Sequence, residues 1–146
     1  MLEFEFFDFL NEECKDIREK VFVIEQGFNE EFDTYDNRSI HLLVRNNGES
    51  IATSRAFKES EGVYHIGRVA VLKDYRRCGI GSKMLEAFEK ELLSRGAKEI
   101  VLGSQLKAKT FYEKNGYIEY GDIFLDEGCP HILMKKQLIK SISKKS

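Results

Sequence analysis

The sequence predicts a single α/β domain built around a mixed sheet, and three observations support this. The chain has 146 residues, which is the length of one domain and enough to bury about 68–70% of the surface of the unfolded chain. Hydrophobic residues make up 42% of it and there is one proline, so a disordered or collagen-like chain is excluded. Short β-like runs alternate with segments of helical period, in the order β-α-β-β-β-α-β-α-β-β.

The first part of the chain indicates one strand and one helix. Alternating apolar residues predict a strand over 2–6, and apolar residues at spacings of three and four predict a helix across 17–28. We expect this helix to end near Gly27, because glycine readily adopts the left-handed conformation that stops a helix. Residues 29–37 are polar and acidic, and we expect either a loop or a broken second helix there.

The middle of the chain indicates an antiparallel meander. Between residues 39 and 72, three β-like runs are separated by the turn pairs Asn47-Gly48 and Glu61-Gly62. The expected elements of the remainder are a helix from Gly81 to a stop at Gly96, a strand over 98–104, a second helix from 107 that ends at Gly116 and a strand pair within 123–138. We therefore expect one domain over 1–139 and a disordered basic tail at 140–146.

Several classes of protein are excluded at this stage. No apolar run approaches the roughly 18 residues of a membrane span, and the first residues lack the features of a signal peptide, so we expect a cytoplasmic protein without a membrane partner. The three cysteines and three histidines have no spacing typical of a disulfide framework or a metal site, so we expect no metal. A pI near 6 argues against nucleic-acid binding.

The charge is unevenly distributed along the chain. Residues 1–37 carry 12 acidic and 3 basic side chains, a net charge of −9, whereas 38–146 carry 13 acidic and 20 basic side chains, a net charge of +7. The acidic run is either a solvated surface or a region that attracts a cationic amine over long range.

The most informative segment is the run Arg76-Arg77-Cys78-Gly79-Ile80-Gly81, between an apolar strand and an amphipathic helix. The first turn of a helix has amide N–H groups without intrahelical partners and carries a partial positive charge, so it attracts phosphate. Glycines let the main chain approach such a ligand closely, and the two arginines add charged donors. The alternative is an ordinary turn between a strand and a helix.

The chain resembles the GNAT N-acetyltransferase superfamily at this loop and at a second motif. The loop matches Arg/Gln-x-x-Gly-x-Gly/Ala, and Ala108-x-x-Phe111-Tyr112 followed by Gly116-Tyr117 matches a later helix of that superfamily. The resemblance extends to the smaller ElaA-like branch. Its matching segments are Arg18-x-x-Val21-Phe22-Val23-x-Glu25-Gln26, Asp36, His41-Leu42 and Gly128-x-Pro130-His131-Ile132-x-Met134.

The resemblance implies a sheet of about seven strands that splays after the fourth strand, with helices on both faces, and acetyl-CoA as co-substrate. The pantetheine arm would align with the main chains of Val69 and Val71, and the diphosphate would bind the amides of residues 77–82. Gln105 replaces an asparagine of many members and would face either the cofactor or the acceptor. The implied cofactor-binding residues are Val69, Val71, Arg76, Arg77, Gly79, Ile80, Gly81, Ser82 and Gln105.

The resemblance also implies the chemistry. Tyr112 would protonate the departing thiolate, the alternative being that it only packs its helix onto the sheet. An amine acceptor must lose a proton, and the segment 64–68 offers no carboxylate to accept it. Glu25 is the preferred residue for acceptor binding or deprotonation. Asp33, Asp36, His41 and His131 are further candidates for acceptor binding, and each of these residues could instead be structural.

We therefore expect an acetyl-CoA-dependent N-acetyltransferase that acts directly on a primary amine of a small molecule or peptide, as a monomer or homodimer. A non-catalytic CoA-binding sensor or interaction module is the alternative, which the missing carboxylate in 64–68 keeps open. The identity of the acceptor does not follow from the sequence, because loops form its pocket.

Overall fold

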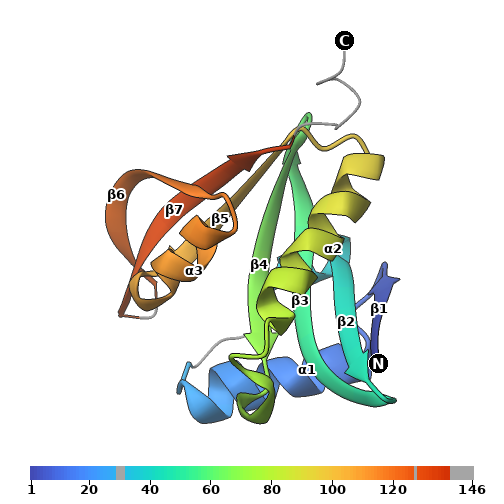
Figure 1. Cartoon of the computed structure of the whole chain (residues 1–146). Helices are drawn as coiled ribbons and strands as arrows, with labels where there is room; N and C mark the ends of the chain where they lie inside the picture. Colours follow the sequence, from blue (N-terminus) through green and yellow to red (C-terminus); the bar gives the residue numbers. More distant parts are fainter. Residues whose placement is uncertain (29–31, 127, 139–146) are drawn as a thin grey trace. The chain divides into compact units, whose positions relative to one another are not determined.

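A computed structural model describes residues 1–28, 32–126 and 128–138 and contains a seven-stranded mixed sheet in the order β1-β2-β3-β4-β5-β7-β6 (Figure 1). The strand β4 pairs in parallel with β5, whereas β1–β2, β2–β3, β5–β7 and β6–β7 are antiparallel. The strands are β1 (Leu2–Phe7), β2 (Ile40–Asn46), β3 (Glu49–Ser60), β4 (Val63–Val71), β5 (Glu99–Gln105), β6 (Ile118–Asp126) and β7 (Cys129–Gln137). The expected α/β class with a mixed sheet is confirmed.

Helical segments connect these strands. The α-helices are α1 (Glu12–Arg18), α2 (Ile80–Ser94) and α3 (Lys109–Lys114). A π-helix, η1 (Glu19–Glu25), continues α1, and the 3-10 helices are η2 (Thr34–Arg38), η3 (Lys73–Tyr75) and η4 (Leu106–Ala108). The helix α2 is followed by Gly96 at φ +96°, the left-handed stop that the sequence indicates.

The chain divides into two compact units. Unit 1 comprises Met1–Phe57 and Ile66–Ala87, and unit 2 comprises Lys58–His65 and the described part of Phe88–Ser146. The elements β3, β4 and α2 each contribute to both units, so each unit is described by itself.

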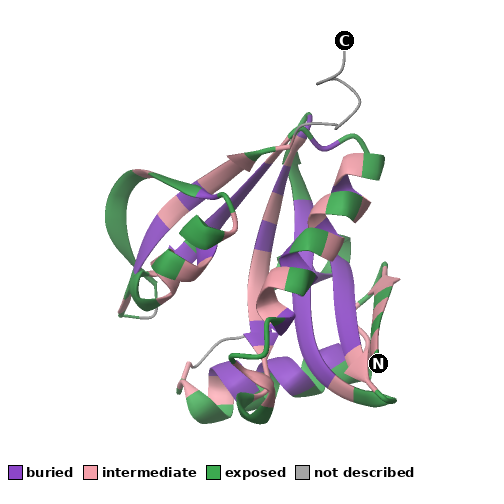
Figure 2. Ribbon diagram, viewed as in Figure 1, coloured by how far each residue is buried: buried purple, intermediate pink, exposed green. Residues whose placement is uncertain are grey.

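The core of unit 1 forms where the first helical segment packs on the strands. Residues Ile17 and Val21 lie one helical turn apart and are both buried, as their spacing predicts. The strand β2 is buried continuously from Ile40 to Val44 rather than at alternate positions, and His41 is the polar residue of that run (Figure 2). The buried cluster consists of Cys14, Ile17, Val21, Phe22, Leu43 and Ala70, with Phe7, Leu10, Phe28 and Leu72 packed against it.

Unit 2 has its own buried side chains. The second half of α2 buries Phe88 and Leu92, and β5 buries Ile100 and Leu102. Tyr117 is also buried, and its hydroxyl donates a 2.8 Å hydrogen bond to Glu89 of α2. This bond satisfies the polar end of a buried aromatic side chain.

Some expected boundaries differ from the structure. The first helical segment begins at Glu12, and its second half winds as a π-helix, which apolar spacing alone does not distinguish from an α-helix. The acidic stretch contains the 3-10 helix η2, which Asp33 caps, so a broken second helix is the better of the two interpretations. The strand β6 begins at Ile118, earlier than the sequence indicates. Residues 29–31 and the expected tail at 140–146 lie outside the described residues.

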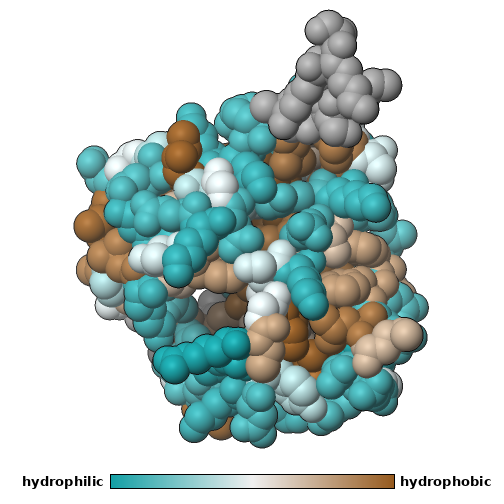
Figure 3. All heavy atoms as spheres, viewed as in Figure 1, coloured by the Kyte–Doolittle hydropathy of each residue, from teal (hydrophilic) through white to brown (hydrophobic). Residues whose placement is uncertain are grey.

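The surface seen in Figure 3 is mostly hydrophilic, with hydrophobic atoms in separate patches. Exposed apolar side chains are normal when they are scattered in this way. Among the described residues, no helix combines the length and the apolar character needed to cross a membrane.

Candidate functional site

The middle of β4 contains an unusual main-chain conformation. Arg68 has φ +50°, a left-handed value that costs free energy for a residue with a Cβ, so the surrounding structure must hold it there. The Ser54 hydroxyl donates a 3.2 Å hydrogen bond to the carbonyl of Gly67, next to this residue. The ladder between β4 and β5 covers only Val63 to His65, so Val69 and Val71 lie beyond it.

The loop after β4 turns the chain sharply into α2. Arg77 has φ +62° and Gly79 has φ +77°, and Lys83 N–H donates a 3.2 Å bond to the carbonyl of Gly79. The amides between them therefore belong to the first turn of a 15-residue helix, where N–H groups have no intrahelical partner. A Cβ placed on Gly79 would meet no heavy atom within 4 Å, so there is open space beside the loop. This geometry fits an anion such as a diphosphate.

Arg76, at the start of this loop, makes three directed hydrogen bonds within unit 1. Its Nε donates to the carbonyl of Val71 at 2.8 Å, and its two terminal nitrogens donate to the carboxylate of Glu25 at 2.6 and 2.7 Å. The hydrogen bond with Glu25 raises the pKa of the Arg76 guanidinium. Two residues that the sequence assigns to different roles, cofactor binding and deprotonation, are thus bonded to each other.

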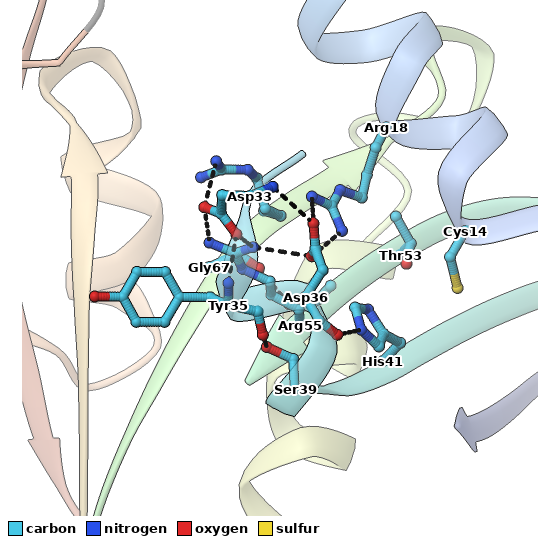
Figure 4. A network of polar contacts seen from close by, with 12 residues as sticks. Cys14, Arg18, Asp33, Tyr35, Asp36, Ser39, His41, Thr53, Arg55 and Gly67 are labelled. Carbon is cyan, nitrogen blue, oxygen red and sulfur yellow. Dashed lines mark hydrogen bonds and ion pairs between the residues drawn. The ribbon is translucent and has the colours of Figure 1, made fainter. Parts of the chain in front are cut away.

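A second set of ion pairs lies in unit 1 and joins buried side chains to partly exposed ones (Figure 4). The Arg18 guanidinium donates to both oxygens of Asp36 at 2.7 and 3.1 Å, and its side chain is only 1% exposed. Arg55 donates to both oxygens of Asp33 at 2.6 and 2.9 Å, and also to Asp36 at 2.9 Å. Arg68 of β4 donates to Asp33 at 3.2 Å. The Asp36 network, meaning Arg18, Asp33, Asp36, Arg55 and Arg68, thus connects α1, η2 and two strands.

The network keeps both carboxylates ionised. Desolvation would raise the pKa of Asp36, but the hydrogen bonds and charge of Arg18, the Asp33 N–H and Arg55 lower that pKa to about 2. The pKa of Asp33 is lowered as well, because Arg55 and Arg68 outweigh the effect of burial. The negative charge that the sequence predicts for acceptor attraction is therefore compensated by arginine at Asp33 and Asp36.

His41 of β2 lies next to Asp36 of this network. It is fully buried, and its Nε2 lies 3.0 Å from the carbonyl of Asp36. Desolvation lowers the pKa of His41, although the carbonyl and charge of Asp36 act in the opposite direction. In the part of the chain that the structure describes, His41 Nδ1 and Arg55 Nε are buried without a hydrogen-bond partner. The roles of Asp33, Asp36 and His41 in acceptor binding remain predictions.

Tyr112 is the buried residue of α3 and belongs to unit 2. Its ring makes edge contacts with Phe111 at 5.0 Å and Tyr117 at 5.9 Å between ring centres. Burial raises the pKa of Tyr112, so the phenol is protonated at neutral pH. A protonated phenol is the form required of a proton donor.

Gln105 and His131 are direct neighbours in unit 2. They are cross-strand partners at the ends of the β5–β7 ladder. His131 is largely buried, its Nδ1 lies 2.8 Å from the carbonyl of Cys129, and its ring lies 5.6 Å from that of Phe124. This end of the ladder therefore places a predicted cofactor residue beside a predicted acceptor residue.

Sequence reasoning overlooks three residues of unit 1, namely Ser54, Arg55 and Arg68. Arg55 lies within the buried stretch of β3, and a charged residue in such a stretch is a signal for a buried partner. Nothing in the sequence marks Arg68 as left-handed, because that conformation favours glycine and the adjacent residue is Gly67.

The described residues contain no cluster of metal ligands, and one of the three cysteines is buried. No group of three or more His, Cys, Asp or Glu side chains is arranged there to hold a metal ion. Cys14 is buried, its thiol donates toward the carbonyl of Leu42, and desolvation raises its pKa to about 11. A thiol in this state is a poor nucleophile at neutral pH.

Comparison with known proteins identifies relatives over nearly the whole chain. A family model described as an acetyltransferase (GNAT) domain matches residues 8–138. The uncharacterized N-acetyltransferase YjcF of Bacillus subtilis is 36% identical over 131 residues, which cover 86% of this chain and 93% of that protein. The crystal structure of Escherichia coli ElaA is 27% identical with a TM-score of 0.79, covering 93% and 99% of the two chains. A crystal structure of an aminoglycoside 6'-N-acetyltransferase complexed with coenzyme A shares the fold, at 20% identity, a TM-score of 0.73 and coverage of 94% and 98%.

Proposed function

Because the chain belongs to the GNAT acetyltransferase family, we propose that it transfers an acetyl group from acetyl-CoA directly to a primary amine of a small molecule or peptide. The observation that carries the proposal is the left-handed turn at Arg77 and Gly79, which leads directly into the first turn of α2. The space beside Gly79 is open. Helix amides arranged in this way bind phosphate groups.

The donor would bind mainly to main-chain groups. The amides of Arg77, Gly79, Ile80, Gly81 and Ser82 would bind the diphosphate, with Arg76 adding N–H donors. Val69 and Val71 lie past the end of the β4–β5 ladder, which favours the addition of a pantetheine arm there as an extra strand. The coenzyme A complex of a protein with this fold is consistent with such a site.

Tyr112 would donate the proton in the second half of the reaction. The amine nitrogen attacks the thioester carbonyl carbon, the carbon–sulfur bond then breaks, and the sulfur takes the electron pair and a proton. Burial raises the pKa of Tyr112, so the phenol keeps its proton until the thiolate develops, then hydrogen-bonds to the sulfur and passes the proton to it. A proton from solvent then restores the phenol. The proton lost by the amine passes to a base or to water.

Binding of coenzyme A to a loop variant tests the donor site. Gly79→Ala puts a Cβ at a left-handed position in the loop, and Gly48→Ala does the same at φ +88° in the β2–β3 turn. Both changes cost similar backbone strain, about 1 kcal/mol. Isothermal titration calorimetry with coenzyme A should show weaker binding for Gly79→Ala only. Absence of binding to the wild type, or equal binding by both variants, would contradict the proposal.

Release of free thiol from acetyl-CoA with a panel of primary amines tests catalysis. Tyr112→Phe should lower kcat by about 10²–10⁴ while coenzyme A still binds. Tyr117→Phe is the matched control, because its hydroxyl bonds to Glu89 and its loss should lower stability rather than kcat. Coenzyme A binding without turnover of any amine would favour a sensor or interaction module instead.

A further inference from the structure

We propose that Glu25 is a positioning residue of the donor loop, which fixes Arg76 at the junction between β4 and the loop. This inference rests on the proposed use of acetyl-CoA and assigns Glu25 a role other than proton acceptor. It is carried by the bidentate contact between Glu25 and Arg76, which lie 51 residues apart in the sequence.

The three bonds of Arg76 join three segments of unit 1. Glu25 is the last residue of η1, Val71 is the last residue of β4, and Arg76 itself follows η3 at the start of the loop. A guanidinium has five N–H donors in one plane, and these contacts use three of them. Arg76 can therefore remain bonded to Glu25 and still offer donors to a diphosphate.

The contact leaves Glu25 poorly suited to accept a proton. Each of its two oxygens accepts a short bond from a terminal nitrogen of Arg76, at 2.7 and 2.6 Å. Protonation of the carboxylate would weaken a charge-assisted pair of this geometry. The positive charge of Arg76 also compensates the negative charge of Glu25, so the carboxylate does not repel an anionic ligand at the loop.

The loop needs such support because of its main-chain conformation. Arg77 directly follows Arg76 and holds φ +62° without being glycine. A residue in this conformation persists when neighbouring contacts determine it. The side chain of Arg76 is tied to both Glu25 and Val71, so the residue before the strained position is held in place before any ligand binds. A preorganised loop loses less conformational freedom on binding.

Measurement of coenzyme A affinity and turnover in the full chain separates the two roles of Glu25. Glu25→Gln should raise the Kd for coenzyme A and the KM for acetyl-CoA by about three- to tenfold, with kcat at saturating substrates unchanged. Arg76→Gln should weaken binding further, because it also removes the bond to Val71 and a positive charge. Adding Glu25→Gln to Arg76→Gln should then cause no further loss of affinity and should restore part of it, because the partner of Glu25 is already gone and an uncompensated carboxylate is removed from the loop.

Glu13→Gln provides the control, since Glu13 bonds to Arg45 and Ser50 of the same unit and is not part of the loop. It should leave Kd, KM and kcat unchanged. A fall in kcat for Glu25→Gln with an unchanged Kd would overturn the proposal and assign Glu25 to deprotonation. An unchanged or tighter Kd with unchanged kcat, or additive effects in the double variant, would also overturn it. If the wild type does not bind coenzyme A, the proposed function itself fails.

Discussion

Asp36 and Glu25 each accept two bonds from one arginine, but the two pairs differ in burial. The Arg18–Asp36 side chains are 1% and 6% exposed, whereas the Arg76–Glu25 side chains are 36% and 39% exposed. A buried charge that loses its partner cannot be solvated, and an exposed one can. The buried Arg18–Asp36 pair therefore cannot lose one partner without a large loss of stability, whereas the exposed Arg76–Glu25 pair can.

The difference also bears on where each pair can act. The Asp36 network connects α1 and η2 to β3 and to the left-handed residue of β4, so it supports the strand that precedes the loop 76–81. The Glu25–Arg76 pair lies at the loop itself, where water and a ligand can reach it. Changes to the first pair should appear in stability, and changes to the second in affinity.

The largest expected effect comes from Asp36→Asn. This change removes the anion that lies between Arg18 and Arg55 and leaves buried positive charge uncompensated. The free energy of unfolding should fall by about 3–5 kcal/mol. Urea unfolding followed by circular dichroism measures it.

Asp16→Asn is the control for that experiment. Asp16 pairs with Lys20 one turn along the helix, at 3.8 Å and with 70% of its side chain exposed. Its loss should change the unfolding free energy by about 0.5 kcal/mol or less. If the two variants are equally stable, the burial of the Asp36 network has no energetic consequence and the comparison fails.

As the pH is lowered, the free energy of unfolding should fall in two steps, the first from His41 and the second from Asp36 of the buried network. Folding lowers the pKa of His41 below its value in the unfolded chain, which is about 6.5. Neutral His41 therefore contributes its full share to the free energy of unfolding above that pH, and this share is lost as the pH falls below it. The pKa of Asp36 falls from 3.8 to about 2, which corresponds to about 2 kcal/mol that is lost as the pH falls from about 4 toward 2.

Unfolding free energies of the wild type and His41→Gln, measured from pH 8 to 2, test this. The variant should lack the first loss of stability and keep the second. The prediction is wrong if, below pH 6.5, the free energy of unfolding falls no more for the wild type than for His41→Gln. His41 would then have the same pKa in the folded and unfolded states.

The conformation of Arg68 provides a smaller effect. Arg68→Gly and Arg68→Ala both remove the contact with Asp33, but only alanine must hold a Cβ at φ +50°. The glycine variant should therefore be more stable than the alanine variant by about 1 kcal/mol. Thermal or urea unfolding of the pair measures the difference. At an ordinary strand position the order would be reversed, because glycine weakens a strand.

Most of the fold is predictable from local patterns. The meander, the helix stops at Gly27 and Gly96, and the final strand pair follow from spacing and turn residues. The winding of η1 as a π-helix does not, because its apolar residues fit an α-helix equally well. The order of β5, β7 and β6 also depends on pairing between distant segments rather than on local sequence.

The site is only partly predictable, because a side chain's role depends on its partner. The sequence identifies the loop at Arg76 to Gly81 and the acidic residues Glu25 and Asp36. It cannot show that Glu25 pairs with Arg76 and Asp36 with Arg18, since these contacts span 51 and 18 residues. For Asp36, the structural alternative agrees with its pairing to Arg18.

The smallest expected effect on stability is that of Glu25→Gln. Because the Glu25–Arg76 pair is more than one-third exposed, its loss should change the unfolding free energy by about 1 kcal/mol or less. The difference from the wild type should shrink further between 0.05 and 0.5 M salt, because ions screen exposed charges and hardly affect buried ones. Urea unfolding at the two salt concentrations, with Asp36→Asn in parallel, measures both pairs. A salt-independent loss of several kcal/mol for Glu25→Gln would show that this pair is as obligatory as the buried one, and that weaker coenzyme A binding by the variant reflects a damaged fold.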